Sequence, residues 1–218
     1  HFKNGESFIP WDKSPETSRS LKALLKWRLN CKGTAWKEDA PADYVEFNNP
    51  PLNKNNFIQH INHASLLIDF SNVRFLVDPQ FTQRVGPVSF LGPKRRHPLP
   101  FQLEDIQKLD VVLLTHNHYD HMNLETLKKI QTRYRPHFIV AHSNGPYLVD
   151  IGINKEQITE LDWWEETQHR EIKVSLAPAQ HWSKRRLFDR NFALWGSFVL
   201  ENSQKKVFIA GDTGFASH

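Results

Sequence analysis

The sequence predicts a layered α/β protein (α+β in some schemes). From residue 57 onward, short β-rich segments and helical segments alternate along the chain, which is typical of sheets covered by helices. The apolar run at residues 110–114 has the composition of a strand buried on both faces. At 218 residues, the chain fits one domain or part of a slightly larger one. We expect an N-terminal helical and extended segment over residues 1–56 and the main domain over residues 57–218.

The N-terminal segment contains one predicted helix. Ser14 and Pro15 form a helix start signal, and the leucines that follow fall on one face with Lys22 and Lys26 beside it. Two interpretations stay open: an ordinary helix packed on the domain, or a basic amphipathic helix at a membrane surface. Residues 39–56, rich in Pro and Asn, are expected to link this helix to the main domain.

The main domain is predicted to contain many strands and few helices. Ser71 and Asn72 are expected to form a tight turn between two strands. Helical spacing predicts helices at residues 104–109, 123–133 and 145–151. Strands are predicted at residues 57–62, 65–70, 73–77, 111–114, 137–141, 157–161, 171–177, 194–201 and 206–210.

The composition narrows the classes of protein. Hydrophobic residues make up 39% and charged residues 24%, which fits a folded protein and excludes a disordered one. Apolar runs of about eighteen residues, as a membrane-spanning helix needs, do not occur. A single cysteine, Cys31, excludes an internal disulfide framework and suits a reducing cytosol. The net charge of +4 favours anionic partners, and the twelve histidines direct the search to metal ligands.

The candidate chemistry lies after the predicted strand at 111–114. There His116, His118, Asp120 and His121 fall within six residues, and imidazole with carboxylate is a good donor set for zinc and similar divalent ions. Six residues cannot complete two metal sites. Further ligands are expected from later loops, and His181 and Asp212 each follow a predicted strand, where α/β proteins place their sites. Two interpretations of His63 stay open: a hydrogen-bonded histidine in a strand, or a residue that orients a metal ligand.

These motifs resemble the metallo-β-lactamase superfamily. The shared pattern is His-x-His-x-Asp-His at 116–121, followed by His181 and Asp212. Further stretches are similar to the phospholipases D that hydrolyse N-acylphosphatidylethanolamine. They are Asn-His-Ala-Ser at 62–65, Asp-Pro at 78–79, Gly-Pro-Lys-Arg at 92–95, the Trp-rich segment at 160–166, Gln-His-Trp-x-Lys-Arg at 180–185, Leu-Trp-Gly-Ser at 194–197 and Ala-Gly-Asp-Thr-Gly at 210–214.

The resemblance implies a fold, a metal centre and a reaction. The fold would be a four-layer αββα sandwich with two divalent ions, most often Zn²⁺, at its rim. His116, His118 and His181 would bind the first ion, Asp120 and His121 the second, and Asp212 would bridge them. A bridging hydroxide would attack phosphorus and release N-acylethanolamine and phosphatidate. Asp120 would orient this hydroxide as the catalytic carboxylate, whereas Tyr119 either faces the substrate or packs in the loop.

The main departure from the family pattern concerns the C-terminal side. The superfamily supplies a last histidine ligand and the final strands and helices beyond the Gly-Asp-Thr-Gly motif. The resemblance therefore implies that the C-terminal part of the sandwich lies outside this sequence. Asn62 stands where relatives usually have Gly, and Met122-Asn123 where they often have Leu-Asp; both are expected to be tolerated.

The remaining expectations concern partners and competing functions. The basic runs at 94–96 and 184–186 are either solvated loops or contacts to phosphate and to lipid headgroups. We expect a phospholipid substrate, peripheral contact with an anionic membrane surface, a cytoplasmic location and no nucleic-acid partner; the oligomeric state stays open. The competing functions are a lactonase, a nuclease or cyclic phosphodiesterase of the same fold, and a non-catalytic interaction module stabilised by metal.

Overall fold

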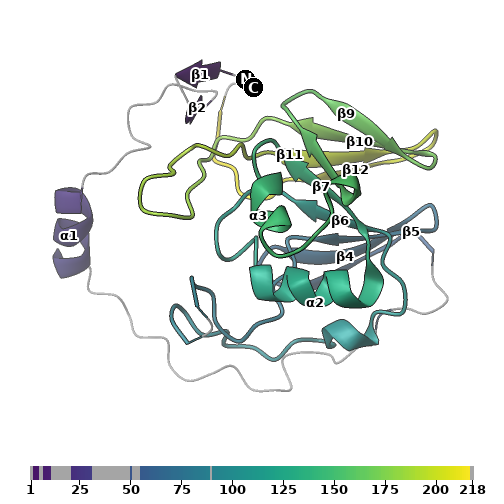
Figure 1. Ribbon diagram of the computed structural model, residues 1–218, viewed down its shortest axis with the longest axis horizontal. Helices are drawn as coiled ribbons and strands as arrows, with labels where there is room; N and C mark the ends of the chain where they lie inside the picture. The colour runs from purple at the N-terminus through teal and green to yellow at the C-terminus, as the bar shows by residue number, and fades with distance from the viewer. Residues whose placement is uncertain are drawn as a thin grey trace.

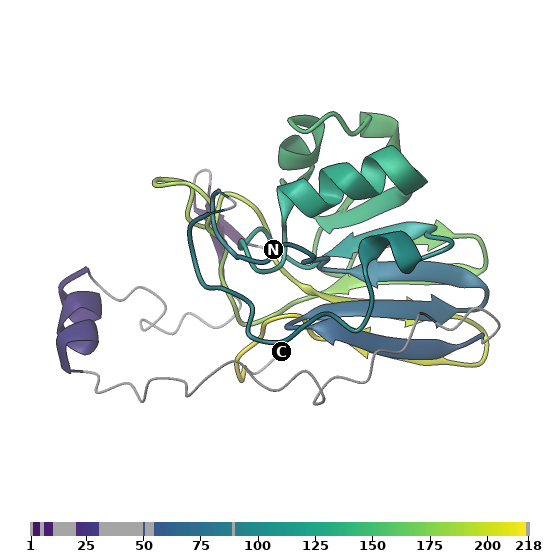
Figure 2. The same cartoon turned by 90° about the horizontal axis from the view of Figure 1, so that it is seen from below.

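Two β-sheets packed face to face form the centre of the molecule (Figures 1 and 2). The computed structural model describes residues 2–4, 7–10, 21–30, 50, 55–88 and 90–216. Helices α2 (Leu124–Tyr134) and α3 (Gly145–Val149) cover the outer face of one sheet (Figure 2). In the described part of the chain no helix covers the outer face of the other sheet, so this part contains three of the four layers of an αββα sandwich.

The larger sheet has six strands in the order β3-β4-β5-β6-β7-β8. Strand β4 pairs antiparallel with both β3 and β5, whereas β5, β6, β7 and β8 are mutually parallel. The predicted turn at Ser71 and Asn72 is confirmed, because both residues have positive φ angles, 53° and 60°, as a type I′ hairpin turn requires. The strands are β3 (Phe57–Asn62), β4 (Ser65–Phe70), β5 (Val73–Val77), β6 (Val111–Leu114), β7 (His137–Ala141) and β8 (Ile158–Leu161).

The smaller sheet is antiparallel, with four strands in the order β12-β11-β10-β9. Strand β10 alternates buried and partly exposed residues along its length, as expected when one face lies on the core and the other does not. Strand β9 was not predicted from the sequence. The bounds are β9 (Glu166–His169), β10 (Ile172–Ala177), β11 (Ser197–Glu201) and β12 (Lys206–Ile209).

The six-stranded sheet has a hydrophobic core on each face. Between the two sheets, Phe75 and Val111 pack with Val174 and Phe198. On the other face, the alternate residues of the same strands pack against α2 and α3. Strand β6 is therefore buried on both sides, as its apolar sequence predicted. The rigid ends of β5 and β6 provide the platform for the loops described below.

The N-terminal part contains two strands that were not predicted individually. It contains a hairpin of β1 (Phe2–Asn4) and β2 (Ser7–Ile9), and the Phe8 side chain is buried in the core between the sheets, 1% exposed. Helix α1 (Leu21–Asn30) is confirmed and lies apart from the two sheets (Figures 1 and 2). The predicted start signal at Ser14 and Pro15 lies outside the described residues.

The shorter helical elements complete the described chain. The expected helix at 104–109 is only a 3-10 turn, η3 (Leu103–Asp105), and a second 3-10 turn, η4 (Lys155–Gln157), precedes β8. Helix α2 begins as predicted, because the Asn123 side chain accepts a hydrogen bond from the Thr126 backbone N–H. A search of the described residues for a helix long and apolar enough to cross a membrane finds none.

Candidate metal centre

The candidate site lies where five strands end at one edge of the sandwich. Strands β5 and β6 are parallel, so the residues that follow them, Asp78 and the loop from Thr115, meet at this edge. The turn after β3 places His63 at the same edge. Strands β10 and β12, both antiparallel to β11, bring His181 and Asp212 there from the smaller sheet. Residues 63, 116–121, 181 and 212 are thereby brought together.

Three imidazoles form the first group of candidate ligands. His116 Nε2 lies 2.9 Å from His118 Nδ1, and His181 Nε2 lies 3.2 Å from the same atom. A tetrahedral zinc ion with Zn–N bonds of about 2.0–2.1 Å holds two nitrogens roughly 3.3 Å apart. The observed spacing is close to this value, so the three ring nitrogens fit one divalent ion.

A second group of candidate ligands lies beside the first. His63, Asp120 and His121 each offer a ligand atom within 4.8 Å of the others, and His116, His121 and Asp212 form a further such group. Asp212 lies between the groups, since its Oδ1 is 3.3 Å from His121 Nε2 and its Oδ2 is 3.7 Å from His181 Nε2. A carboxylate in this position can contact two ions with its two oxygens.

Buried Asp78 forms hydrogen bonds with the metal-site loop, which is the segment 115–123 between β6 and α2. Its Oδ1 accepts a hydrogen bond of 2.8 Å from the Thr115 N–H, and its Oδ2 lies 2.6 Å from Thr115 Oγ1 and 2.8 Å from His121 Nδ1. A hydrogen bond at Nδ1 orients the His121 ring and leaves Nε2 directed toward Asp212. Asp78 was not predicted as a site residue. The signal that could have identified it is the Asp-Pro pair directly after a buried strand.

The electrostatics of the site keep three histidines neutral. Burial, followed by the charges of neighbouring histidines, lowers the pKa of His116 well below its usual range and lowers that of His118 to about 4. Burial also lowers the pKa of His181. Neutral imidazoles carry the lone pairs that metal binding needs. Burial opposes the charged form of His121 too, but Asp78 and Asp212 outweigh it and raise its pKa to about 10.

Tyr119 packs within the loop. Its O–H donates a hydrogen bond of 2.6 Å to the Arg185 carbonyl, and the Arg185 guanidinium lies 4.5 Å from the centre of the Tyr119 ring. The same guanidinium donates to the carbonyls of Asn117 and Met122. This geometry favours the packing interpretation of Tyr119 over substrate contact. It also shows that Arg185 holds the loop in place, a role that the sequence did not indicate.

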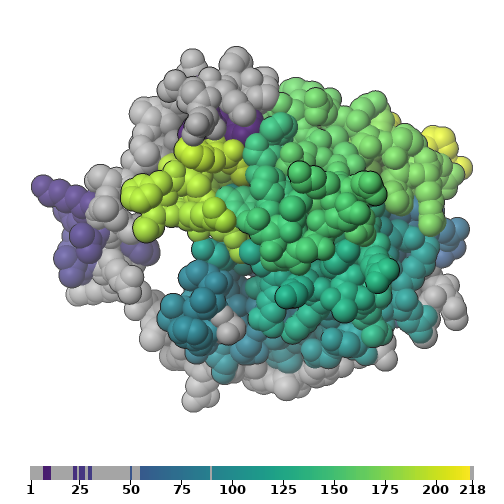
Figure 3. Space-filling view, viewed as in Figure 1, coloured from purple at the N-terminus to yellow at the C-terminus, as the bar shows by residue number. Residues whose placement is uncertain are grey.

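Two loops with exposed apolar tips lie at the same side of the molecule, next to this edge (Figures 1 and 3). In the loop at 183–192, Leu187 and Phe188 are 80% and 89% exposed. In the loop at 85–96, Phe90 is 72% exposed and Leu91 is exposed as well. Each tip adjoins one of the basic runs noted in the sequence, at 94–96 and 184–186.

Comparison with known proteins identifies relatives along most of the chain. A family model described as a β-lactamase superfamily domain matches residues 73–218. An uncharacterized Mycobacterium tuberculosis protein is 31% identical over 88% of this chain and 52% of its own length. The N-acyl-phosphatidylethanolamine-hydrolyzing phospholipase D 1 of Caenorhabditis elegans is 29% identical over 98% of this chain and 64% of its own. The mitochondrial enzyme of that name from Saccharomyces cerevisiae is 38% identical over 67% and 32%.

Solved structures with the same fold are more distant in sequence. An isothiocyanate hydrolase from Delia radicum gut bacteria superposes with a TM-score of 0.56 at 22% identity, covering 73% of this chain and 64% of its own. The metallo hydrolase Igni18 from Ignicoccus hospitalis gives 0.55 at 21% identity, with 73% and 62% covered. The chain spans about half the length of the Mycobacterium relative. On the family match, the chain belongs to the metallo-β-lactamase superfamily, in which it is similar to the N-acylphosphatidylethanolamine-hydrolysing phospholipases D.

Proposed function

We propose that this metallohydrolase is a dinuclear phosphodiesterase that cleaves N-acylphosphatidylethanolamine as a phospholipase D does. The observation that carries the proposal is the position of Asp212 between two groups of candidate ligands, with Oδ1 3.3 Å from His121 Nε2 and Oδ2 3.7 Å from His181 Nε2. Two ions held in this way suit displacement at phosphorus. The identity to relatives that carry this activity in their names supports the choice of substrate.

The proposed reaction consumes one water molecule. The bond between phosphorus and the ethanolamine oxygen breaks, a new bond forms between phosphorus and the water oxygen, and the products are N-acylethanolamine and phosphatidate. We assign His116, His118 and His181 to one ion, Asp120 and His121 to a second, and Asp212 to both. The imidazole and carboxylate donors favour Zn²⁺. When bound, the two ions would lower the pKa of a bound water molecule and stabilise charge on the phosphoryl oxygens.

Asp120 is assigned the role of orienting the attacking water. Burial opposes its ionisation, but the hydrogen bond from His63 and the charge of His121 outweigh burial and lower the pKa of Asp120 to about 2. The carboxylate is therefore ionised at neutral pH and accepts hydrogen bonds. His63 Nε2 lies 3.1 Å from Asp120 Oδ2, so His63 fixes the orientation of this carboxylate rather than contacting the reacting atoms.

The substrate of this reaction resides in a bilayer, so the proposal includes contact with an anionic membrane surface from the cytoplasmic side. The apolar tips at Leu187 and Phe90, each next to basic residues, are suited to this contact, since each Lys or Arg near an anionic surface contributes about 1 kcal/mol. No nucleic-acid partner is proposed.

Metal analysis combined with a lipid assay of the full-length protein tests the function. We expect two ions per chain and hydrolysis of N-acylphosphatidylethanolamine that stops on chelation and returns with Zn²⁺. Asp120→Asn should lower turnover by at least about a hundredfold, within the range for a positioned acid or base, whereas Lys128→Gln on α2 should not. Turnover by the chelated wild-type protein would refute the proposal. Cleavage of a soluble lactone or of RNA in place of the lipid would identify one of the competing functions.

A further inference from the structure

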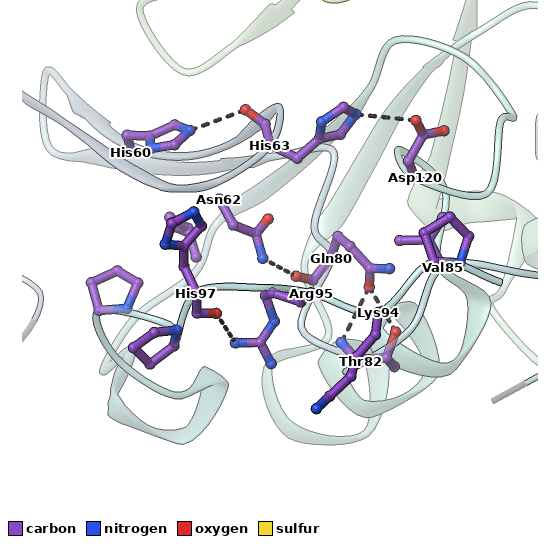
Figure 4. Close-up of a pocket in the computed structure, with 14 residues that line it drawn as sticks. His60, Asn62, His63, Gln80, Thr82, Val85, Lys94, Arg95, His97 and Asp120 are labelled. Carbon is purple, nitrogen blue, oxygen red and sulfur yellow. Dashed lines mark hydrogen bonds and ion pairs between the residues drawn. The ribbon is translucent and has the colours of Figure 1, made fainter. Parts of the chain in front are cut away.

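A cavity of about 590 Å³ opens beside the candidate metal centre (Figure 4). One wall is the end of β3 with the turn that carries His63, and the other is the loop at 80–98. Asp120 and His63 belong both to this wall and to a candidate ligand group. The cavity is therefore continuous with the metal centre and not a separate hollow on the far side of the fold.

Apart from its histidines, the cavity lining contains two cations and one carboxylate among neutral residues. Lys94 and Arg95 line it together with His60 and His97, and the one carboxylate in the lining, Asp120, is already bonded to His63. The Arg95 guanidinium donates to two neutral acceptors, the His97 carbonyl and Gln83 Oε1. Among the described residues neither Lys94 nor Arg95 has an acidic partner, and Arg95 Nε is buried without a hydrogen bond. This uncompensated charge suits an anion.

The two cations are held in place by the backbone of the loop. The Arg95 N–H donates to the Gln83 carbonyl at 2.8 Å, and the Val85 N–H donates to the Pro93 carbonyl at 3.0 Å. At Gly92 the φ angle is +95°, and a Cβ would lie 1.7 Å from the Val85 carbonyl oxygen, so only glycine fits this close approach. Lys94 and Arg95 therefore extend from a fixed ladder, which lowers the entropy cost of binding a ligand.

The rest of the lining is apolar. Ile61, Val85 and three prolines, at 93, 98 and 100, contribute to the walls. A ligand that satisfies the whole cavity has an anionic group next to an alkyl or glyceride portion. Phosphatidate, the product of the proposed reaction, meets both conditions because its phosphate is attached to a glyceride.

We propose that this cavity is a phosphate-binding site outside the metal centre, in which Lys94 and Arg95 hold a phosphate carried on an apolar group. The inference rests on the proposed function and adds to it a site, next to the reacting centre, for the phosphate of the released product. The phosphate comes either from the lipid product or from free inorganic phosphate. The apolar walls favour the lipid.

Calorimetric titration of the full-length, metal-loaded protein tests the site. The probe is dioctanoyl phosphatidate below its micelle concentration, with inorganic phosphate and dioctanoylglycerol as separate arms. We expect Lys94→Gln and Arg95→Gln each to raise the Kd for phosphatidate about tenfold, as loss of a charge-assisted hydrogen bond does. Lys128→Gln, which removes an exposed lysine on α2, should leave the Kd unchanged. Dioctanoylglycerol should bind at least about tenfold more weakly than phosphatidate.

Each result decides one point. Wild-type affinity in both cavity variants would overturn the proposal, as would equal binding of phosphatidate and dioctanoylglycerol. Equal affinities for phosphatidate and inorganic phosphate, both lowered in the variants, would support the site and identify free phosphate as its ligand. A repeat with chelated protein should preserve the effect of Lys94→Gln. Failure of N-acylphosphatidylethanolamine hydrolysis in the wild type would refute the proposed function without changing these binding results.

Discussion

Asp78 is the residue on which the metal-site loop depends most directly. Its Oδ1 accepts a hydrogen bond from the Thr115 N–H, and its Oδ2 accepts from Thr115 Oγ1 and His121 Nδ1. In Asp78→Asn an amide N–H₂ group would replace one carboxylate oxygen. This group cannot accept a hydrogen bond, so a buried donor of Thr115 or His121 would lose its acceptor. We expect metal affinity to fall about 10- to 100-fold, as loss of an outer-shell partner does, and the free energy of unfolding to fall by about 1–3 kcal/mol.

A zinc competition titration with thermal unfolding measures both effects. Asp110→Asn is the matched control, because Asp110 also accepts from a backbone N–H, that of Arg74, but at the opposite end of β6. The control should lose stability and retain metal affinity. Equal metal affinities in the two variants would contradict the role assigned to Asp78.

Arg185 acts on the same loop from the smaller sheet's side. Its guanidinium donates to the carbonyls of Asn117 and Met122 and stacks on Tyr119. A lysine cannot stack and donate to two carbonyls at once. We therefore expect Arg185→Lys to lower metal affinity nearly as much as Arg185→Met, by about tenfold. Arg186→Met, which removes a mainly exposed neighbour, should bind metal as the wild type does. Restoration of affinity by Arg185→Lys would show that charge alone matters.

At the scale of elements, the sequence predicted what local patterns determine. The strands at 57–62, 65–70 and 73–77 were placed correctly because β-branched and apolar runs are separated by turn residues with suitable φ angles. Strand β9 was missed because Glu166–His169 is polar and pairs only with β10. The helix at 104–109 was wrong: only a 3-10 turn forms, and its apolar residues, such as Ile106, reach the core without helical spacing.

Two neighbouring histidines, one on β7 and one on β9, make stability depend on pH. The His137 and His169 rings lie 6.2 Å apart. Burial and the charge of His169 lower the pKa of His137, and burial and the charge of Arg170 lower that of His169. Below the ordinary histidine pKa of 6.5 the unfolded chain therefore binds more protons than the folded chain, and the free energy of unfolding decreases as the pH falls.

His137→Gln should remove part of this dependence. Gln can retain the hydrogen bond that His137 Nε2 makes with Thr159 Oγ1, but it cannot take up a proton. Urea unfolding at pH 7.5 and pH 5.5 measures the loss of stability in each protein. We expect a smaller loss in the variant; the metal-site histidines contribute equally to both proteins. Equal losses would show that the pair does not control this part of the pH profile.

At the scale of the whole molecule, the site combines loops from both sheets, and its candidate ligands are spread along the chain from residue 63 to residue 212. The ligand candidates were found from sequence because each follows an apolar run, and parallel strand ends meet at one edge. The partners of Asp78 and Arg185 could not be found in this way, since their contacts depend on how loops pack. Asp78 contacts the loop after the neighbouring strand β6, and Arg185 reaches the same loop from the smaller sheet. The same holds for the cavity, which exists only when the loop at 80–98 folds over the end of β3.

The two exposed apolar tips belong to this whole-molecule arrangement and give its last prediction. The loops that contain Phe90 and Phe188 lie on the same side of the molecule (Figure 3), and both loops adjoin residues of the candidate site, so a bilayer that covers the two rings would present its lipids to the site. Insertion of each ring should contribute about 1.5–3 kcal/mol. We expect Phe188→Asp with Phe90→Asp to weaken cosedimentation of the full-length protein with anionic vesicles at least tenfold.

Ile58→Ser is the matched control. It removes an exposed apolar side chain at the start of β3, the opposite end of the sheet, and should leave vesicle binding unchanged. Equal vesicle binding by the wild type and the double variant would exclude these loops as the membrane contact.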